Sequence, residues 1–320
     1  MKKVTTTEVC NFLGEHDNFL ILTHRRPDGD TLGSAAALCR GLRQKGKTAH
    51  VLYNPEITEK CRYLLEGLTT DIPAENHTIV CVDTASEGML PAAFADLAGK
   101  IALRIDHHAS ANSFTEMELV DGKTAACGEL IYDVLMDLGV KLDIPLANAI
   151  YTAISTDTGC FRFANTTAHT LRVAAACAEV SPDLYSLNNL HFATVTLQRL
   201  QMQSYMIENA IFLQDRQVCI CPIPLEAEEK IGVTEDDMDN ISGYPRTIAG
   251  VKIAATLRIE KDTGKVKLSL RAAPGYDAGA VCAKFGGGGH AGAAGASMDC
   301  TMDEAVQALI AALPNLGMDN

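Results

Sequence analysis

The stretch NFLILTHRRPDGDTLGS, residues 18–34, combines an apolar run, a cluster of ionisable side chains and the start of a helical pattern. Residues 18–23 predict a buried strand, and residues 32–45 carry apolar side chains at helical spacing. A strand followed by a polar loop and a helix is the first half of a βαβ unit, whose strands are parallel. This stretch therefore predicts a parallel sheet with a polar loop at the carboxyl end of one strand.

The same alternation continues through the first half of the chain. It predicts strands over residues 48–53, 78–82 and 101–105, and helices over residues 58–67, 124–138 and 145–155. Strands that alternate with helices imply a parallel sheet covered on both faces. Residues 168–210 carry helical patterns without a strand signal.

The pattern changes after residue 210. It predicts strands over residues 218–223, 251–259 and 265–270, a hairpin turn at 262–264, and helices over 278–285 and 303–313. We therefore expect an α/β protein with a parallel-sheet domain over residues 1–193, a helical connector over 194–210 and a smaller α/β domain over 211–320.

Length and composition exclude several classes of protein. The 320 residues suffice for two domains, and 47% hydrophobic with 21% charged residues is typical of folded proteins. We expect no membrane segment, because no apolar run approaches the ~20 residues of a membrane span and the first residues lack a signal-peptide core. The eleven cysteines are scattered and odd in number, which is typical of reduced thiols. We therefore expect a cytoplasmic protein.

The charge of the chain limits its partners. A net charge of −13 argues against a protein that coats long duplex nucleic acid, because phosphate backbones require a basic surface. The absence of tryptophan and the 5% aromatic content argue against a module that binds single strands by stacking. A short phosphorylated substrate remains compatible with the charge, since a bound metal can supply positive charge locally.

Ionisable residues recur at the ends of the predicted elements. They are His24, Asp28 and Asp30 after the first strand, Asp83 after the third, Asp106, His107 and His108 after the fourth, and Asp157 after the helix that begins at Pro145. The carboxyl ends of parallel strands form the crevice in which ligands bind. A single aspartate at such a position is usually a helix cap or a turn residue. The recurrence at four element ends favours one shared site.

Electrostatics predicts what this site holds. Four neighbouring aspartates stay ionised together only if cations neutralise them, and two divalent ions match four carboxylates. A set of carboxylates and imidazoles without thiolates suits Mn²⁺ best, with Mg²⁺, Fe²⁺ and Co²⁺ as alternatives and structural zinc disfavoured. Two adjacent metal ions commonly activate water against a phosphate ester. We therefore expect a two-metal site.

A glycine run in the second half is a candidate phosphate site. Residues 285–295 read FGGGGHAGAAG, and glycines allow backbone N–H groups to approach a phosphate closely. His290 can add a hydrogen bond, and the Arg271 guanidinium can bind a terminal phosphate with two donors. The alternatives are a turn or tight packing for the glycines and a surface position for Arg271.

Five motifs occur in the order typical of one family. The stretches HRRPDGDTLGS, VCVDTA, IDHHAS, AISTDTG and GGGGHAGAAG resemble the DHH phosphoesterases of the RecJ-like branch, with a DHH-associated C-terminal domain. The resemblance implies that residues 1–193 form the DHH catalytic domain and residues 211–320 the substrate-binding domain, with the active site in the cleft between them. Together with residues 242–246, SGYPR, the motifs most resemble the bacterial oligoribonucleases that degrade nanoRNA and dephosphorylate pAp, which is 3′-phosphoadenosine 5′-phosphate.

The resemblance implies a role for each motif residue. One metal would be held by His24 and Asp28, the other by Asp30, His107 and Asp157, with Asp83 bridging both. His108 would contact the scissile phosphate or assist proton transfer, and Asp106 would orient this segment. The substrate's terminal phosphate or sugar would be held by Arg271, Gly288, Gly289 and His290.

The resulting prediction is a Mn²⁺-dependent phosphoesterase that cleaves short RNA from its end and converts pAp to AMP. A cyclic-dinucleotide phosphodiesterase is the main alternative, because it would share every metal residue. Manganese pyrophosphatases lack the glycine run followed by histidine, and the complete ligand set argues against a catalytically inactive nucleotide sensor. The resemblance is also compatible with a homodimer.

Overall fold

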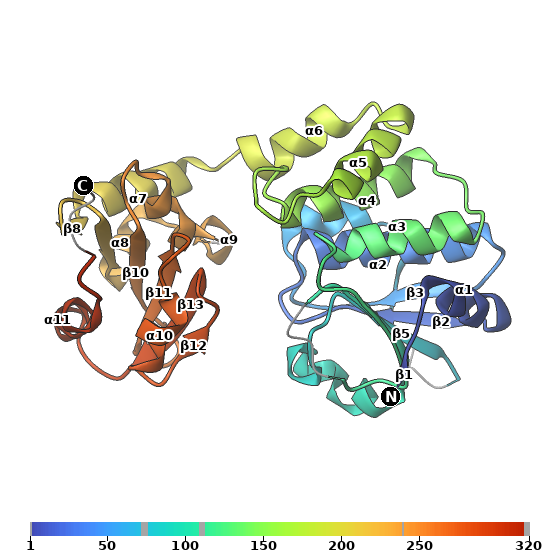
Figure 1. Ribbon diagram of the computed structural model, residues 1–320, viewed down its shortest axis with the longest axis horizontal. Helices are drawn as coiled ribbons and strands as arrows, with labels where there is room; N and C mark the ends of the chain where they lie inside the picture. The colour runs from blue at the N-terminus through green and yellow to red at the C-terminus, as the bar shows by residue number, and fades with distance from the viewer. Residues whose placement is uncertain (1, 72–75, 109–112, 239, 317–320) are drawn as a thin grey trace. The chain divides into compact units, whose positions relative to one another are not determined.

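The computed structural model describes residues 2–71, 76–108, 113–238 and 240–316. Its contacts divide the chain into two compact units, Met1–Thr194 and Val195–Asn320, called the first and second unit below. Figure 1 shows each unit as a central sheet with helices packed against it. In the described residues no helix is both long enough and apolar enough to cross a membrane.

The first unit contains a seven-stranded sheet in the order β1-β7-β6-β5-β2-β3-β4. Every neighbouring pair is parallel, which confirms the predicted parallel sheet. The strands are β1 (Lys2–Lys3), β2 (Phe19–Leu22), β3 (Ala49–Leu52), β4 (Thr69–Thr70), β5 (Thr78–Val82), β6 (Ile101–Asp106) and β7 (Met117–Val120). The sequence predicted the four central strands but not β1, β4 and β7, which lie towards the edges of the sheet and carry no continuous apolar run.

Strand β2 is flanked on both sides by strands that follow it in the chain. After β2 the chain continues to β3 on one side of β2, and it later returns as β5 on the other side. The loops at the carboxyl ends of β2 and β5 therefore diverge, which is the arrangement that opens a ligand crevice in parallel sheets. The ionisable residues that follow β2 and β5 lie at this switch point.

Helices cover both faces of this sheet. The regular helices are α1 (Thr6–Glu15), α2 (Gly29–Gln44), α3 (Cys127–Asp137), α4 (Ile144–Asp157), α5 (Ala168–Val180) and α6 (Leu184–Asn188). Short 3₁₀ segments occupy η1 (Glu59–Leu65), η2 (Glu87–Met89) and η3 (Ala92–Lys100), and a π-helical turn occupies η4 (Asn189–Ala193). The helix expected over residues 58–67 is thus of the tighter 3₁₀ type.

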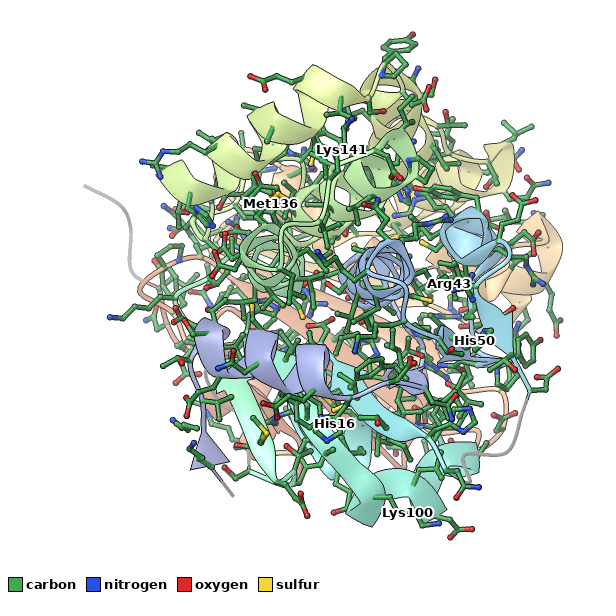
Figure 2. The ribbon with its side chains drawn as sticks, turned by 90° about the vertical axis from the view of Figure 1, so that its right-hand side faces the viewer. His16, Arg43, His50, Lys100, Met136 and Lys141 are labelled. Carbon is green, nitrogen blue, oxygen red and sulfur yellow. The ribbon has the colours of Figure 1, made fainter. Side chains whose placement is uncertain are left out.

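Strand β2 is buried on both faces by these layers. Phe19 and Ile21 belong to the core beneath α2 and α3, whereas Leu20 and Leu22 pack with Phe94 of η3 on the opposite face. Figure 2 shows this layering, with Met136 of α3 and Lys100 of η3 on opposite sides of the sheet. A strand buried on both faces reads as a continuous apolar run, as FLIL does.

Small residues bring α2 and α4 close together. A Cβ atom added to Gly33 would lie 2.5 Å from the Ala149 carbonyl oxygen, and one added to Gly29 would lie 2.5 Å from the Thr156 side chain. Neither position therefore tolerates a larger residue without movement of a helix. This close approach places the end of α4 next to the start of α2.

The second unit contains a six-stranded mixed sheet in the order β12-β13-β11-β10-β9-β8. Its strands are β8 (Ile211–Leu213), β9 (Val218–Ile223), β10 (Ile253–Ile259), β11 (Val266–Ala272), β12 (Gly288–Gly289) and β13 (Ala293–Met298). Strands β9 and β10 are parallel and all other pairs are antiparallel. The hairpin predicted at residues 262–264 joins β10 to β11, whereas β13 was not predicted because its sequence AAGASM lacks β-formers.

Helices complete the second unit. They are α7 (Leu197–Glu208), α8 (Leu225–Ile231), α9 (Glu235–Met238), the 3₁₀ segment η5 (Ile241–Thr247), α10 (Ala278–Ala283) and α11 (Met302–Ala312). Helix α7 occupies most of the stretch assigned to a connector, and its Met202 and Met206 are fully buried against Cys219 and Cys221 of β9.

Candidate metal centre

The first unit brings the ionisable motif residues together at the carboxyl ends of its central strands. His24 follows β2, Asp28 caps α2, and Asp83 follows β5 directly. Asp106 is the last residue of β6, so His107 and His108 continue from that strand. The sequence suggested that Asp157 lies beyond the helix that begins at Pro145, but Asp157 is the last residue of α4. Residues 109 and 110 of the IDHHAS stretch lie outside the described residues.

The start of α2 positions two aspartates. The Asp28 carboxylate accepts hydrogen bonds from the backbone N–H groups of Asp30 and Thr31, each at 3.0 Å, as a helix N-cap does. The buried Asp30 carboxylate accepts the N–H groups of Cys127 at 2.6 Å and Gly128 at 2.9 Å, at the start of α3. The positive end of α3 therefore faces Asp30 and favours its ionised form.

Asp83 lies at the centre of the cluster. Its φ of 52° is left-handed, a conformation that is uncommon for residues other than glycine and that marks functional positions. Its Oδ2 accepts a hydrogen bond from the Thr31 hydroxyl at 2.6 Å. Its Oδ1 is buried and has no hydrogen-bond donor among the described residues. A buried carboxylate oxygen without a donor calls for a ligand or an ion.

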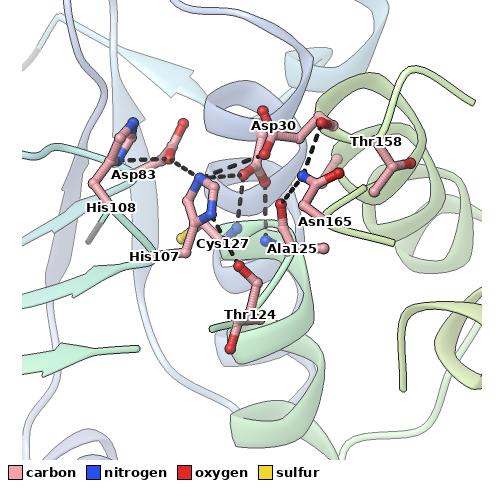
Figure 3. A network of polar contacts seen from close by, with 12 residues as sticks. Asp30, Asp83, His107, His108, Thr124, Ala125, Cys127, Thr158 and Asn165 are labelled. Carbon is pink, nitrogen blue, oxygen red and sulfur yellow. Dashed lines mark hydrogen bonds and ion pairs between the residues drawn. The ribbon is translucent and has the colours of Figure 1, made fainter. Parts of the chain in front are cut away.

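His107 faces three carboxylates at once. Its Nε2 lies 3.5 Å from Asp83 Oδ1 and 3.6 Å from both Asp30 Oδ2 and Asp157 Oδ2. Its Nδ1 lies 3.3 Å from the Thr124 carbonyl oxygen, as Figure 3 shows. Because a carbonyl oxygen only accepts, Nδ1 carries the hydrogen of the neutral ring, and the Nε2 lone pair points at the carboxylates.

His24 repeats part of this arrangement, although its Nε2 lies closest to the Thr31 hydroxyl, at 2.5 Å. Its Nδ1 lies 2.7 Å from the Arg25 carbonyl oxygen, and its Nε2 lies 3.6 Å from Asp83 Oδ2. A neutral imidazole lone pair that faces carboxylate oxygens is unfavourable unless a cation or a proton lies between them. Both histidines therefore present the nitrogen that commonly binds metals, and each is oriented by a carbonyl group at its other nitrogen.

His108 is oriented differently. Its Nδ1 lies 2.7 Å from Asp106 Oδ1, so the carboxylate accepts the ring N–H. Asp106 is fully buried, and its Oδ2 lies 3.8 Å from a guanidinium nitrogen of the buried Arg104. The hydrogen bond from His108 to Asp106 raises the pKa of His108.

The donor atoms form overlapping groups. Three sets have one ligand atom per residue within 4.8 Å of one another: His24, Asp28 and Asp83; Asp30, His107 and Asp157; and Asp83, His107 and His108. Asp83 is grouped with His24 and Asp28, and it lies near the other set through His107, whose Nε2 is 3.5 Å from Asp83 Oδ1. Carboxylates and imidazoles without a thiolate match divalent ions such as Mn²⁺, Mg²⁺ or Fe²⁺. The donor chemistry and the donorless Asp83 oxygen both fit divalent metal ions.

Without a metal ion, repulsion between the carboxylates of this cluster shifts the pKa values of its members. Burial and the neighbouring carboxylates of Asp83 and Asp157 raise the pKa of Asp30, and burial raises the pKa of Asp157 to about 6. Burial disfavours charged His107, but the surrounding carboxylates outweigh it and raise the pKa of His107 to about 10. The site therefore retains protons that a divalent cation must displace, which makes metal binding weaker at low pH.

The second unit holds the predicted substrate-binding residues. Arg271 lies in β11 beside Ala293 of β13, and burial lowers its pKa. Gly289 has a φ of 144°, and a Cβ there would lie 2.6 Å from the Ala293 carbonyl oxygen, so packing requires glycine. A Cβ on Gly288 would meet nothing within 4 Å, so packing does not explain that glycine. His290 is exposed, and its N–H donates to the Ala293 carbonyl oxygen at 2.9 Å.

Sequence reasoning missed several supporting residues. Thr31 is fully buried, and its hydroxyl contacts His24, Asp28 and Asp83. Its position three residues after the helix cap is the only signal that the sequence contains. Arg104 lies 3.3 Å from Glu118 of β7, and an arginine within the apolar run IALRID was a usable signal for a buried ion pair.

Comparisons with known proteins cover both units of the chain. The model of the DHH family, N-terminal domain, matches residues 18–154, and that of the DHHA1 domain matches residues 215–315. A Thermus thermophilus protein named bifunctional oligoribonuclease and PAP phosphatase NrnA is 31% identical over 92% of this chain and 88% of its own length. A Bacillus subtilis protein of the same name is 27% identical over 91% of this chain and 93% of its own length.

A solved structure has the same fold. It is an exopolyphosphatase-related protein from Bacteroides fragilis, with a TM-score of 0.87 and 22% identity over 96% of this chain and 94% of its own. At 22% identity, this likeness shows the fold alone. The match to the Thermus protein extends to the sequence of both domains. The chain therefore belongs to the DHH family, with a DHH domain followed by a DHHA1 domain.

Proposed function

We propose that this protein is a metal-dependent phosphohydrolase that degrades short oligoribonucleotides and dephosphorylates pAp. The convergence of His24, Asp28, Asp30, Asp83, His107 and Asp157 at one edge of the sheet carries this proposal. The names of the Thermus and Bacillus relatives, which cover nearly the whole chain, support the same substrates.

We assign the candidate ligands to two sets, with Asp83 shared between them. His24 and Asp28 would hold one divalent ion, and Asp30, His107 and Asp157 the other. Mn²⁺ suits these oxygen and imidazole donors best. Bound divalent ions supply an activated water near neutral pH and neutralise charge on the phosphate.

The remaining steps belong to the chain's own side chains. Asp106 holds His108 through Nδ1, which leaves Nε2 to donate a hydrogen bond to a phosphate oxygen or a proton to the leaving group. The raised pKa of His108 favours the protonated ring that such a donor needs. His108 and Asp83 are therefore the residues that we assign to catalysis, with Asp106 as a positioning residue.

The second unit supplies the candidate substrate contacts. We assign binding of the substrate's terminal phosphate or sugar to Arg271, Gly288, Gly289 and His290. The open space over Gly288 supports this assignment, because a residue there could approach a ligand with its backbone N–H. The domain boundaries at residues 193 and 210, the enclosure of substrate by both domains and the homodimer stay predictions. All eleven cysteines are free thiols, which supports the cytoplasm as the site of action.

The experiment is a side-by-side measurement of initial rates with Mn²⁺. The substrates are pAp, a 5′-phosphorylated diribonucleotide, cyclic di-AMP and pyrophosphate. We expect pAp and the diribonucleotide to be hydrolysed and EDTA to abolish both activities. Fastest cleavage of cyclic di-AMP would support a cyclic-dinucleotide phosphodiesterase instead, and cleavage of pyrophosphate alone would contradict the proposal.

A further inference from the structure

Two adjacent arginines border a cavity beside the candidate metal centre. Arg25 and Arg26 follow His24 directly, and both are exposed. Together with Glu56, Leu90 and Ala92 they line a cavity of about 640 Å³. None of the six candidate metal ligands lines this cavity. Among the described residues, neither guanidinium forms an ion pair or a hydrogen bond.

The backbone that presents these arginines is held in a costly conformation. Arg26 has a φ of 48°, a left-handed conformation that residues other than glycine adopt uncommonly. Its N–H donates to Glu56 Oε2 at 3.1 Å, and the Arg25 N–H donates to the Met89 carbonyl oxygen at 2.7 Å. Both backbone positions are thus fixed while both side chains remain available.

One buried side chain connects this pair to the metal centre. Asn54 is fully buried, and its Nδ2 donates to the His24 carbonyl oxygen at 3.0 Å. Its Oδ1 accepts the N–H of Glu56 at 3.0 Å, and Glu56 in turn accepts the N–H of Arg26. The same amide therefore sets the position of a candidate metal ligand and of the arginine pair. A chance cluster of surface arginines would not need this chain of hydrogen bonds to a buried side chain.

We propose that Arg25 and Arg26 form an anion subsite for a substrate phosphate other than the one that is hydrolysed. This inference rests on the proposed function, and of the two groups assigned there to the second unit, the terminal phosphate or the sugar, it leaves the sugar to the second unit. Guanidinium groups bind phosphate oxygens with two parallel donors, and they keep their charge at every physiological pH. In a chain with a net charge of −13, two arginines without carboxylate partners provide the local positive charge that a second phosphate needs.

The test compares two substrates that differ by one phosphate. The first is a 5′-phosphorylated diribonucleotide and the second is the same dinucleotide without its 5′-phosphate. Arg26→Gln and Arg25→Gln should each lower kcat/KM for the first substrate roughly 10- to 100-fold, mainly through KM, because each removes charge-assisted hydrogen bonds. For the second substrate the change should stay within about twofold. Arg172→Gln, at an exposed arginine of α5, is the matched control and should leave both rates unchanged.

Two other kinetic outcomes overturn the inference. Equal losses of kcat/KM on both substrates would mean that the arginines act at the hydrolysed phosphate or in the folding of the loop. Unchanged kcat/KM on both substrates would mean that the arginines bind no substrate phosphate. If the wild type hydrolyses neither dinucleotide, the proposed function fails, and calorimetric binding of pAp in EDTA still decides the inference. Weaker binding by Arg26→Gln than by Arg172→Gln supports the subsite, and equal binding overturns it.

Discussion

The metal centre of the first unit and the glycine-rich segment of the second unit are built in opposite ways. In the metal centre, the side chains come from the residues that follow β2, β5 and β6 and from α2 and α4, and buried partners such as Thr31 and Asp106 orient them. Residues 286–292 of the glycine-rich segment are glycines or carry exposed side chains, and the backbone pairing of β12 with β13 sets the shape. Chemistry requires fixed side chains, whereas close approach to a ligand requires bare backbone. The predictions below test this contrast.

The largest effect is expected at Asp83, which belongs to two of the ligand groups. Asp83→Asn removes the charge that both ligand sets share, and Mn²⁺-dependent turnover should fall roughly 10³-fold or more. Circular dichroism should show that the metal-free protein still folds, although its thermal midpoint should fall, because the substitution also removes the charge that attracts His24 and His107. Asp96→Asn, at an exposed aspartate of η3, is the control. Near-normal turnover of Asp83→Asn would remove this site from catalysis.

The next effect tests the packing that positions the metal centre. Gly33→Ala places a methyl group 2.5 Å from the Ala149 carbonyl oxygen, so α2 and α4 must separate and Asp157 must move away from Asp30. We expect a loss of about 1–3 kcal/mol in the free energy of unfolding by urea. Activity should fall at the same time.

The control for this packing lies in α1. Gly14 is also helical, but a Cβ there would meet nothing within 4 Å. Gly14→Ala should leave activity unchanged and raise the free energy of unfolding by up to about 1 kcal/mol. Equal effects of the two substitutions would show that helix separation does not control the site.

Two neighbouring glycines test the glycine-rich segment in the same way. Gly289→Ala should lower the free energy of unfolding by roughly 1–3 kcal/mol, because its Cβ would overlap the Ala293 carbonyl oxygen. Gly288→Ala should change it by less than about 0.5 kcal/mol and raise KM for pAp several-fold. Urea unfolding and steady-state rates measure both. A stable Gly288→Ala variant with unchanged KM would contradict a ligand contact there.

The smallest effect separates acid sensitivity of the fold from that of the metal centre. Burial lowers the pKa of His191 to about 4, and its Nε2 lies 3.0 Å from the Tyr63 hydroxyl. The unfolded chain, with an ordinary histidine pKa of 6.5, binds a proton that the folded protein resists. His191 therefore costs no stability above pH 7, and the free energy of unfolding decreases as the pH falls from 6.5 towards 4.

A variant isolates this contribution. At pH 5.5 the wild type should lose about 1 kcal/mol that His191→Gln does not lose, relative to the same proteins at pH 7.5. Urea unfolding at the two pH values measures the difference in the slope. His16→Gln changes an exposed histidine and should keep the wild-type slope. Parallel slopes for wild type and His191→Gln would show that His191 titrates normally.

The accuracy of the sequence-based predictions differed between elements. Strands β2, β5 and β6 were predicted within one residue at each end, since each is a buried apolar run bounded by polar residues. Strands β7 and β13 were missed because partners supply their stability: β7 pairs between β1 and β6, and β13 pairs between β11 and β12. Local residue preferences carry no information about such partners.

The candidate site shows the same division. Asp28 and Asp30 could be recognised from their motif, but the hydrogen bonds that Cys127 and Gly128 donate to Asp30 cross about a hundred residues of sequence. Asp157 was expected beyond a helix, and it lies within the last turn of α4 because α4 packs closely against α2. The left-handed backbone of Arg26 and Asp83 has no sequence signal, since neither residue is glycine.

The amino-acid sequence alone determined the four central strands of the first unit, the chemical types of the site residues and their positions at element ends. Periodicity and side-chain chemistry are local properties, so they can be read along the chain. Only the tertiary structure decided which carboxylate faces which imidazole, which oxygen of Asp83 lacks a donor and which glycine lies against open space. Those facts depend on contacts between residues far apart in the chain, and packing of the whole unit sets them.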